Sequence, residues 1–510
     1  KNLAMIHNGI IENYASIKEC LLEQGYTFQS QTDSEVIVHM LDYYYQGDMM
    51  YALKKCVQYL QGSFALCVVC TDYPDCVFVA KKESPMILGK TDTSAFCASD
   101  IPAVLDYTKD ICALEDGQMA VLRPGSIEVY DFFGDPVSTT WMHISYDACA
   151  AQKGGYDTFM QKEMHEQPYV IKETLRAHIE NNLAMPELSG LDVSKINQIY
   201  FVACGTAYHA SLYAQYILRT WVDLPIYCIS ASEFRYGNYR IDENTLCIFV
   251  SQSGETADTL EALKLTKSKN CDSLGIINVK ESSIARICDN VIYTLAGPEI
   301  AVATTKAYIA QVLVLSLIAI YLGRKNNKLT KKDEENLINE LKSLPININS
   351  IINKDLYKKI ANDIYNEEDI FFIGRNVDYA LCMEGSLKLK EISYIHSEAY
   401  AAGELKHGTI SLIDNNTPVF AVVTKDSIKE KTISNIKEVK ARGAKVILVT
   451  NDTNIDKEIY DILIEIPKTN DLIQNMLTIV PLQVLSYEIA KLRGCDIDKP
   501  KNLAKSVTVE

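Results

Sequence analysis

The sequence predicts an α/β protein with two copies of a parallel sheet flanked by helices, preceded by a smaller α+β domain. β-type runs alternate with helical patterns from about residue 198 to residue 279. A similar series of runs begins again at Ile370, whereas the first 147 residues mix strands and helices less regularly. Strands and helices that alternate at this spacing are typical of parallel sheets covered on both faces.

Composition narrows the class of protein. The chain has 510 residues, of which 48% are hydrophobic, as expected for a globular protein of about three or four domains. Its formal net charge of -16 argues against a nucleic acid or a membrane surface as partner, because both favour clustered Lys and Arg. The 15 cysteines lack the spacing of a disulfide scaffold, which indicates a reducing compartment, and we expect a cytoplasmic protein.

Cys67 and Cys70 have the spacing of a C-x-x-C motif. They lie inside the apolar run Phe64–Cys70, without a second pair or a partnering His. We therefore expect a buried strand here, no metal site and no cofactor.

Residues 1–147 are expected to form the α+β domain. The predicted strands are Phe64–Cys70, Cys76–Ala80 and Gln118–Leu122, and the predicted helices are Asn13–Gln24 and Ser34–Tyr45. Near the front, Asn8-Gly9 lies in the largely apolar run Ile6-His7-Asn8-Gly9-Ile10-Ile11, and a hairpin turn is the more common structure for such a pair. The functional alternative is an oxyanion hole, in which an Asn amide and the next backbone N–H point at one developing negative oxygen.

The first parallel-sheet domain is predicted over residues 190–330, after a linker and a leading helix over 148–189. Its predicted strands are Gln198–Ala203, Ile226–Ser230, Thr245–Val250 and Ser273–Val279, and its predicted helices include Gly205–Arg219 and Ala257–Lys267. The apolar segment Ala307–Leu322 is interrupted by Gln311 and Ser316 and is short for a membrane span. We expect it to be a buried helix.

A second copy is predicted over residues 361–498, after a helical bridge over 331–360. Ile370–Arg375 aligns with the strand that begins at Ile199, and Val419–Val423 and Lys445–Thr450 match later strands. The second copy lacks the hydroxyl-rich turn of the first, so we expect the two copies to differ in function.

That turn is Ser251-Gln252-Ser253-Gly254-Glu255-Thr256, between a predicted strand and a helical pattern that resumes at Ala257. A strand end, a glycine turn and a helix start gather unpaired backbone N–H groups at the positive end of a helix dipole, and the hydroxyls add donors. We interpret the turn as a phosphate-binding site. A capping box that only starts a helix fits these residues equally well.

Lys388 and Glu391 lie three residues apart on one face of a predicted helix over Glu384–Ile392. A surface ion pair is the default explanation for such a pair. His407 follows in a predicted loop of small residues over 396–408, where it could reach a ligand, although a single loop histidine is more often solvated.

The C-terminal tail over 499–510 contains Lys505 among apolar residues. A lysine in a desolvated pocket has a lowered pKa and is a competent amine for Schiff-base chemistry with a carbonyl. A solvated terminal lysine is the alternative.

Together these segments resemble the glutamine:fructose-6-phosphate aminotransferases, also called glucosamine-6-phosphate synthases. The matching motifs are H-N-G-I-I-E-N at 7–13, C-G-T at 204–206, S-Q-S-G-E-T at 251–256, A-Y-A-A-G-E-L-K-H-G at 399–408 and N-L-A-K-S-V-T-V-E at 502–510. Each motif alone is weak, but the ordered set covers nearly the whole chain and is highly specific.

The resemblance implies a glutaminase domain of the N-terminal-nucleophile type followed by two sugar isomerase (SIS) domains. The glutaminase frees ammonia from glutamine, and the isomerase half converts fructose 6-phosphate and ammonia to glucosamine 6-phosphate, a precursor of hexosamines and UDP-N-acetylglucosamine. The expected partners are fructose 6-phosphate and glutamine. A homodimer is also expected, because in this family the residue that matches His407 reaches the site from the neighbouring subunit.

The resemblance also assigns roles to residues. Lys505 would form the Schiff base, Glu391 would move a proton between C1 and C2, Lys388 would assist, and His407 would open the sugar ring. The residues implied to bind the sugar phosphate are Thr206, Ser251, Gln252, Ser253, Thr256, Val302 and Ala504. On the glutamine side, Asn8 and Gly9 match the oxyanion hole, and Asp33 matches the carboxylate that binds the α-amino group.

The sequence departs from the family pattern in four places. The family's nucleophile is an N-terminal cysteine, and this sequence starts downstream of it and of the arginine that binds the glutamine carboxylate. Cys20 lies in a helical pattern and cannot replace the nucleophile, so we expect no glutaminase activity from the chain as written. Ala207 and Lys501 stand where the family often has serine and arginine, and the lost hydroxyl would weaken phosphate binding by about 1 kcal/mol.

Two other classes of function are compatible with parts of the sequence. A sugar-phosphate-binding regulator would bind fructose 6-phosphate without turnover, and would not need Lys505, Glu391 or His407. A deglycase or plain isomerase of the same superfamily would not need the glutamine-site motifs of the front domain.

Overall fold

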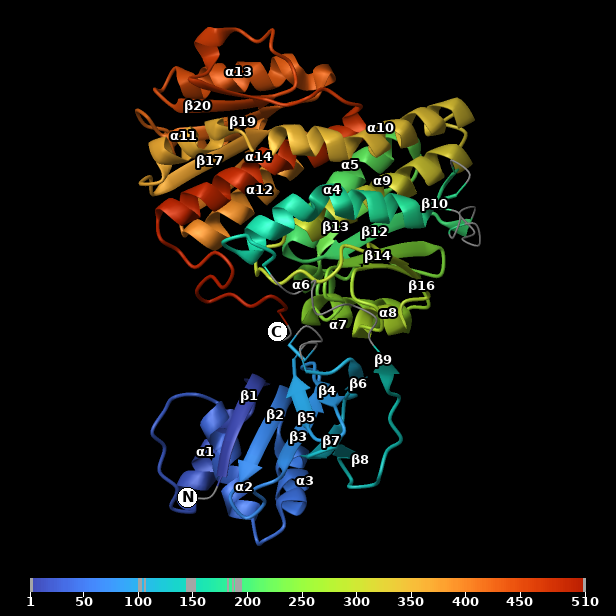
Figure 1. Ribbon diagram of the computed structural model, residues 1–510, viewed down its shortest axis with the longest axis vertical. Helices are drawn as coiled ribbons and strands as arrows, with labels where there is room; N and C mark the ends of the chain where they lie inside the picture. Colours follow the sequence, from blue (N-terminus) through green and yellow to red (C-terminus); the bar gives the residue numbers. More distant parts are fainter. Residues whose placement is uncertain are drawn as a thin grey trace. The chain divides into compact units, whose positions relative to one another are not determined.

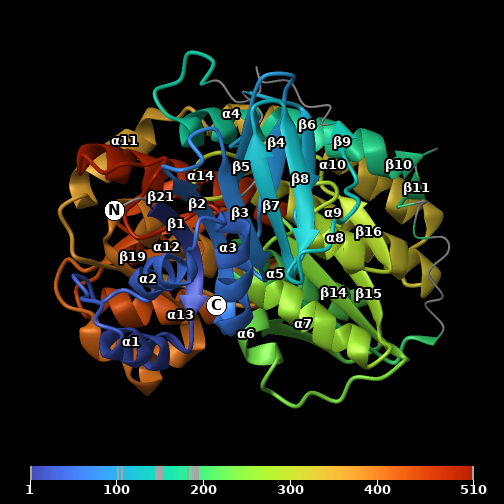
Figure 2. The same cartoon turned by 90° about the horizontal axis from the view of Figure 1, so that it is seen from below.

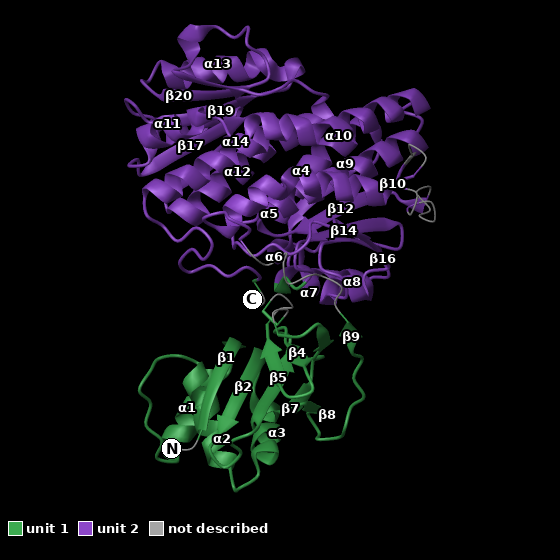
Figure 3. Ribbon diagram, viewed as in Figure 1, with its two compact units in different colours: residues 1–152, 255–257, 507–510 green, residues 153–254, 258–506 purple. Residues whose placement is uncertain are grey.

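The structure of the protein is a computed structural model, and it describes residues 3–99, 103–104, 107–143, 153–180, 183–185, 188 and 195–507. The chain divides into two compact units (Figure 3). The first comprises Lys1–Gln152, Glu255–Ala257 and Val507–Glu510, and the second comprises Lys153–Gly254 and Asp258–Ser506. Each unit has its own sheets and its own hydrophobic core.

The first unit packs three helices against two antiparallel sheets. The five-stranded sheet has the order β1-β2-β3-β7-β8, with β1 at Leu3–Ile11, β2 at Gly62–Cys70, β3 at Val77–Lys82, β7 at Gln118–Arg123 and β8 at Ser126–Asp131. The four-stranded sheet has the order β5-β4-β6-β9, with β4 at Ile87–Lys90, β5 at Ala95–Ala98, β6 at Asp110–Ala113 and β9 at Met142–His143. The helices are α1 at Tyr14–Glu23, α2 at Ser34–Tyr44 and α3 at Met49–Tyr59.

Strand β2 shows how the layers of this unit arise from alternation. Phe64 and Leu66 pack in the core formed with the helices, whereas Ala65 and Cys67 pack against residues of the second sheet. Successive side chains of a strand point to opposite faces, so one strand serves both cores. The α+β prediction for this region is confirmed.

Strand β1 runs through Asn8 and Gly9 without a turn, so the hairpin prediction is wrong. Asn8 pairs with Ala65 and Gly9 pairs with Phe64 in an antiparallel ladder. Gly9 has φ +142°, and a Cβ at this position would lie 2.1 Å from the carbonyl oxygen of Ser63. The close approach of β1 to β2 therefore requires glycine here.

The second unit contains two five-stranded parallel sheets, as the sequence predicts. The first has the order β13-β12-β14-β15-β16, with β12 at Gln198–Ala203, β13 at Ile226–Ser230, β14 at Thr245–Ser251, β15 at Asp272–Ile277 and β16 at Asn290–Tyr293. The second has the order β18-β17-β19-β20-β21, with β17 at Asp369–Gly374, β18 at His396–Ala401, β19 at Pro418–Val423, β20 at Lys445–Thr450 and β21 at Ile462–Glu465.

A layer of long helices lies between these two sheets (Figure 1). The layer consists of α4 at Phe159–His178, α5 at Gly205–Trp221, α9 at Lys306–Lys325, α10 at Lys331–Ile351, α11 at Asp355–Ile364, α12 at Val377–Ser393 and α14 at Asp471–Leu492. The outer faces are covered by α6 at Ala231–Phe234, α7 at Ala257–Ser268 and α8 at Ser283–Ile287 on the first sheet, and by α13 at Lys429–Lys440 on the second. Figure 2 shows α7 and α8 beside β14, β15 and β16.

Alternation along the central strands again explains the layers. In β12, Phe201 faces the central helices and Val202 faces the outer ones. In β17, Phe372 faces the central helices and Phe371 faces the α13 side. Strands buried on both faces read as continuous apolar runs, which is why the sequence shows them clearly.

Two helices of the central layer test what the sequence predicts. Helix α4, within the segment interpreted as a linker, buries Met160, Met164 and Ile171 in the common core. Helix α9 contains the apolar segment Ala307–Leu322. Among the described residues, α9 alone is long and apolar enough to suit a membrane span, with a mean hydropathy of 1.7. That stretch is wholly buried inside the protein. The predicted buried helix is confirmed.

Candidate active site

The two copies of the parallel-sheet domain meet where α5 packs against α12. Each helix follows the carboxyl end of a central strand, α5 after β12 and α12 after β17. The Thr206 hydroxyl at the start of α5 donates to Glu384 Oε1 at 3.0 Å, and Lys388 Nζ donates to the Thr206 oxygen at 3.0 Å. A predicted phosphate-site residue and a predicted catalytic-site residue, taken from different copies, are therefore in direct contact.

Lys388 is held between two carboxylates. Its Nζ lies 2.6 Å from Glu391 Oε2 and 3.5 Å from Glu384 Oε1. Burial by itself would lower the pKa of Lys388, but the negative charges of Glu384 and Glu391 outweigh it and raise the pKa. The side chain is 1% exposed, so the default explanation of a surface ion pair is wrong.

Glu384 extends this cluster to the first copy. Its carboxylate is fully buried, and Oε2 lies 2.8 Å from Nδ1 of His209 on α5. Neither residue was identified from the sequence. Glu384 lies one turn before Lys388, and this i, i+4 spacing was the available signal. Glu391 differs from Glu384 because its side chain is 20% exposed, which makes it the carboxylate of the pair open to a ligand.

The C-terminal lysine forms a second buried ion pair. Lys505 Nζ lies 2.5 Å from Glu299 Oε2 and 3.3 Å from the hydroxyl oxygen of Thr304. The lysine side chain is 15% exposed, and the glutamate side chain is 0% exposed. The alternative of a solvated terminal lysine is therefore wrong.

Glu299 is fixed by the start of α9. Its Oε1 accepts hydrogen bonds from the backbone N–H groups of Thr305 (3.0 Å) and Ala307 (3.1 Å). Burial alone would raise the pKa of Glu299, but the ammonium of Lys505 and these hydrogen bonds outweigh it and lower the pKa. Glu299 is thus an ionised carboxylate in a buried site.

Glu163 on α4 supports the loop that carries Glu299. Its Oε1 accepts from the backbone N–H groups of Ile300 (2.5 Å) and Ala301 (3.3 Å). Burial, followed by the nearby charge of Glu299, raises the pKa of Glu163 to about 8. Glu163 therefore carries a proton at neutral pH, and only the tertiary structure reveals it.

The same region ties the tail to α4. The Asp498 carboxylate accepts from the backbone N–H groups of Phe159 (2.9 Å) and Met160 (3.0 Å) at the start of this helix. The Asp498 carbonyl accepts from Val302 N at 3.0 Å. Val302, predicted to contact the sugar phosphate, thus lies where the tail begins. Ala504, predicted to do the same, is exposed and precedes Lys505.

The hydroxyl-rich turn has the local structure that its sequence predicts. β14 ends at Ser251, whose Oγ accepts the Gly254 N–H at 3.0 Å. Gly254 has φ +69°, and a Cβ there would lie 1.9 Å from Ser282 Oγ, so glycine is needed. The backbone of Gln252 is fixed by the N–H of Asn278 at 3.3 Å, Ser253 lies inside the turn, and Thr256 falls in the segment grouped with the first unit.

The second copy fills the equivalent position with its own carboxylate. Gly205 and Asn376 follow equivalent strands and share a left-handed backbone, with φ 54° and 57°. Two residues after Asn376, Asp378 accepts the backbone N–H of Thr424 at 2.9 Å and also the Thr424 hydroxyl. The adjacent space measures about 10 Å³, enough for roughly one water. The two copies therefore differ in structure at this position.

His407 is not joined to this cluster by a hydrogen bond or an ion pair in the described part of the chain. It ends a 3-10 helix, η4, at Ala402–His407 and is exposed. The loop predicted over 396–408 is wrong in its first half, which forms strand β18 at the sheet edge.

The predicted glutamine-site residues gather at one end of β1 in the first unit. Asp33, at the start of α2, accepts the backbone N–H of Ile11 at 2.8 Å. His7 Nδ1 lies 2.9 Å from Ser34 Oγ, and burial lowers the pKa of His7. Asn8 and Gly9 occupy β1 between these two contacts, so the structure places them beside Asp33.

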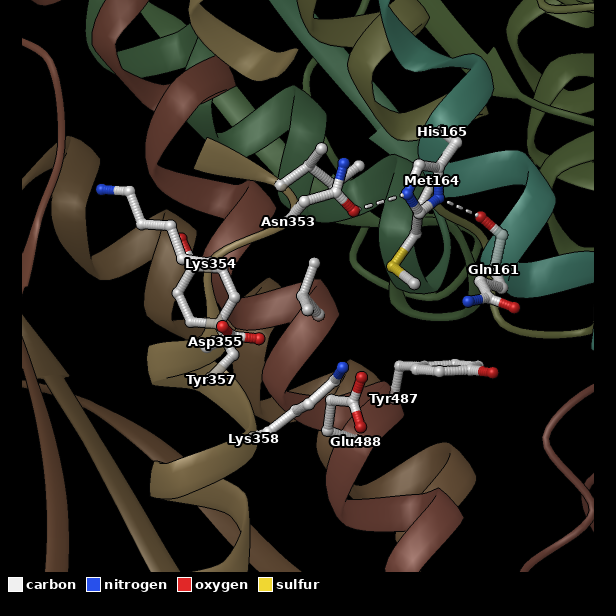
Figure 4. Close-up of a pocket in the computed structure, with 12 residues that line it drawn as sticks. Gln161, Met164, His165, Asn353, Lys354, Asp355, Tyr357, Lys358, Tyr487 and Glu488 are labelled. Carbon is white, nitrogen blue, oxygen red and sulfur yellow. Dashed lines mark hydrogen bonds between the residues drawn. The ribbon is translucent and has the colours of Figure 1, made fainter. Parts of the chain in front are cut away.

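A cavity of about 210 Å³ lies elsewhere in the second unit, between α4, α11 and α14 (Figure 4). His165 lines it, with Nδ1 2.8 Å from the Gln161 carbonyl oxygen and Nε2 2.9 Å from Asn353 Oδ1. None of the predicted site residues lines this cavity. In the described ranges, no group of three or more His, Cys, Asp or Glu is arranged to hold a metal ion.

Comparisons with known proteins agree with this architecture. The chain matches the glutamine amidotransferase domain over residues 1–106 and the SIS domain twice, over 192–321 and 363–493. It is 48% identical to the glutamine–fructose-6-phosphate aminotransferase (isomerizing) of Caldanaerobacter subterraneus and 47% identical to that of Clostridium tetani, covering 100% of this chain and 84% of each relative.

A solved structure extends the likeness to the fold. The C-terminal domain of glucosamine-fructose-6-phosphate aminotransferase from Francisella tularensis superposes with a TM-score of 0.66 at 37% sequence identity. The match covers 68% of this chain and 100% of that domain.

Proposed function

The chain belongs to the glutamine–fructose-6-phosphate aminotransferase (isomerizing) family, and we propose that Lys505 and the Lys388–Glu391 pair carry its sugar chemistry. The function is conversion of fructose 6-phosphate and glutamine-derived ammonia to glucosamine 6-phosphate. One observation supports this assignment of residues most strongly. Lys505 and the Lys388–Glu391 pair are far apart in sequence, and both lysines occupy buried or half-buried ion pairs.

The hydroxyl-rich turn is proposed to anchor the phosphate of the sugar. Ser251, Gln252 and Ser253 sit at the carboxyl end of a central parallel strand, where ligands of open α/β sheets bind. Thr206 lies at the start of the helix after the neighbouring strand, β12. Thr256, Val302 and Ala504 would complete the contacts. The second copy cannot use the same anchor, because Asp378 fills it.

The chemistry follows from the charges around the two lysines. Lys505 would condense with the C2 carbonyl of the open-chain ketose, and the iminium would make the C1 protons more acidic. Glu391, half-buried and paired with Lys388, would move the proton between C1 and C2. The Lys388 ammonium would stabilise the negative charge that develops nearby.

Ring opening is assigned to His407 and implies a second subunit. His407 is exposed, and among the described residues no hydrogen bond or ion pair joins it to Lys388, Glu391 or Lys505, so we propose that it acts in the neighbouring subunit of a homodimer. The described cysteines are free thiols, which supports a cytoplasmic location. The acidic net charge supports the absence of a nucleic acid partner.

In the first unit, Asn8, Gly9 and Asp33 are proposed to bind glutamine. Asn8 and Gly9 would stabilise the oxyanion, and Asp33 would bind the α-amino group. The support is their position at one end of β1, with Asp33 held by the Ile11 N–H.

Formation of glucosamine 6-phosphate from fructose 6-phosphate and ammonium tests the assignment. Borohydride should trap the sugar on Lys505, where mass spectrometry locates it. Lys505→Ala should abolish both the product and the adduct, whereas Lys499→Ala, a control at an exposed tail lysine, should retain them. Full turnover in Lys505→Ala would exclude the proposed mechanism.

A further inference from the structure

The contact between Lys505 and Glu299 raises a question of proton balance. An amine attacks a carbonyl through its lone pair, and an ammonium group has none. In the ion pair with Glu299, at 2.5 Å, Lys505 is an ammonium group that donates a hydrogen bond to the carboxylate. If Lys505 forms a Schiff base, as the proposed function requires, a nearby group must first take its proton.

The groups around Lys505 narrow the choice of acceptor. The Thr304 hydroxyl, 3.3 Å away, is too weak a base at neutral pH. Glu163 already carries a proton at neutral pH, since burial and the charge of Glu299 raise its pKa to about 8, so it cannot accept another one. In the described part of the chain, Glu299 is the carboxylate within hydrogen-bonding distance of Lys505.

We propose that Glu299 is a further catalytic residue, the base that accepts the proton of Lys505 and later returns it. Two backbone N–H groups at the start of α9 hold its other oxygen, so the carboxylate points at Nζ without freedom to turn. General bases act best when they are held in this way within hydrogen-bonding reach. The charge of Glu299 also contributes to the raised pKa of Lys388, after the larger effects of Glu384 and Glu391.

The steps balance without any further reactant. Lys505 gives one proton to Glu299, and the nitrogen lone pair then forms a bond to C2 while the carbonyl electron pair moves to O2. One proton passes from nitrogen to O2 and gives the carbinolamine. Glu299 then returns its proton to this hydroxyl as the C2–O bond breaks, so that water leaves and a protonated imine remains. Glu299 ends the sequence ionised, as it began.

Two roles of Glu299 predict opposite results. If it is the base, Glu299→Gln should slow imine formation by roughly 10²- to 10⁴-fold, the usual range for general acid–base catalysis. If it only pairs with the ammonium charge, its removal should favour the neutral amine and leave imine formation equally fast or faster. The sign of the change therefore decides between the roles.

The experiment measures borohydride trapping of fructose 6-phosphate on Lys505 after rapid mixing, from pH 6 to pH 9, in the full chain. We expect slow trapping in Glu299→Gln, partial recovery in Glu299→Asp, and recovery of Glu299→Ala with added formate. Fructose 6-phosphate affinity, measured by calorimetry, should change only a few-fold. Glu335→Gln, at an exposed carboxylate of α10, is the matched control and should trap like the wild type.

Each outcome has a distinct meaning. The proposed role of Glu299 would be wrong if a folded Glu299→Gln protein trapped the sugar as fast as the wild type or faster. Failure of formate to rescue Glu299→Ala would agree with that result. Either outcome would leave the proposed function itself intact. Absence of trapping in the wild type would instead contradict the proposed function. Thermal melting of each variant shows whether it is folded, and the formate rescue reports on catalysis even in a destabilised variant.

Discussion

Thr206 donates its hydroxyl hydrogen to Glu384 across the two copies of the parallel-sheet domain, at an oxygen–oxygen distance of 3.0 Å. The same hydroxyl accepts from Lys388, so one side chain at the start of α5 satisfies two charged groups of α12. Buried charges are costly unless they are paired and hydrogen-bonded. The junction of the copies thus depends on a residue also expected to bind the substrate.

Replacement of Thr206 by valine should therefore affect both stability and activity. Loss of the hydroxyl leaves buried Glu384 and Lys388 each without one partner, at a cost of about 1–3 kcal/mol. We expect a lower melting temperature of the second unit and a raised KM for fructose 6-phosphate. Thr206→Ser keeps the hydroxyl and should remain close to the wild type in both measurements. Equal behaviour of the two variants would show that the hydroxyl contributes little.

Glu163 makes the stability of the second unit depend on pH. A glutamate ionises near pH 4.5 in the unfolded chain, whereas the pKa of Glu163 is about 8 in the folded protein. Between these values the folded state holds a proton that the unfolded state has released, so stability is lost as the pH rises from about 4.5 to about 8. Glu299, Lys505 and Lys306 are the charges that act on this group.

Glu163→Gln should remove this dependence, because glutamine mimics the protonated acid and keeps an acceptor for Ile300 and Ala301. We expect the melting temperature of the wild type to fall relative to the variant between pH 5 and pH 8. Glu173→Gln, on the same helix but paired with Arg176 near the surface, is the control. Parallel melting curves for wild type and Glu163→Gln would contradict the protonated state.

Asp378 should produce a similar effect at lower pH. Burial, partly offset by hydrogen bonds from Thr424, raises its pKa from 3.8 to about 6, which corresponds to roughly 3 kcal/mol. Between these two pH values Asp378 is protonated in the folded state but ionised in the unfolded state. The free energy of unfolding therefore decreases as the pH rises from about 4 to about 6.

The pH dependence separates this effect from simple loss of a contact. Asp378→Asn removes the titrating group and one acceptor for Thr424, and the lost acceptor shifts stability equally at every pH. We expect the melting temperature of the variant, relative to that of the wild type, to increase as the pH rises from 4 to 7. A difference that does not change over this range would mean that Asp378 stays ionised.

Gly9 should be essential for the first unit. A Cβ at this position would lie 2.1 Å from the Ser63 carbonyl oxygen, so Gly9→Ala must separate β1 from β2. We expect a loss of stability of the first unit of more than about 3 kcal/mol, beyond the range of most single substitutions. Limited proteolysis of the full chain would detect it.

Gly25→Ala is the matched control for this substitution. Gly25 also has a positive φ, of 87°, but nothing lies within 4 Å of a Cβ built there. It should therefore lose only about 1–2 kcal/mol from the left-handed backbone. Similar protease sensitivity of the two variants would show that backbone strain, and not the contact with β2, sets the requirement for glycine.

Much of the fold follows from local sequence. The central strands β12, β14, β17, β19 and β20 are buried on both faces. Their sequences are therefore continuous apolar runs, from which the strands could be predicted. The edge strands β16, β18 and β21 were missed, because an edge strand is less buried and carries more polar residues. A leading helix was predicted where α4 lies, but its burial in the core was missed, because polar residues such as Glu163 and Thr174 bond inside the protein.

The site divides in the same way. The sequence by itself determined the duplicated α/β domains and the glycine turn at Ser251–Gly254. It also singled out Lys388, Glu391 and Lys505 as candidate site residues. All of these depend on apolar runs, residue spacings and motifs. Only the tertiary structure decided that Glu299 pairs with Lys505, that Glu384 lies beside Lys388 and that Glu163 supports the loop of Glu299. The reason is physical: burial and the charge of distant partners set the protonation of a side chain, and residues such as Glu299 and Lys505 become partners only when the chain folds.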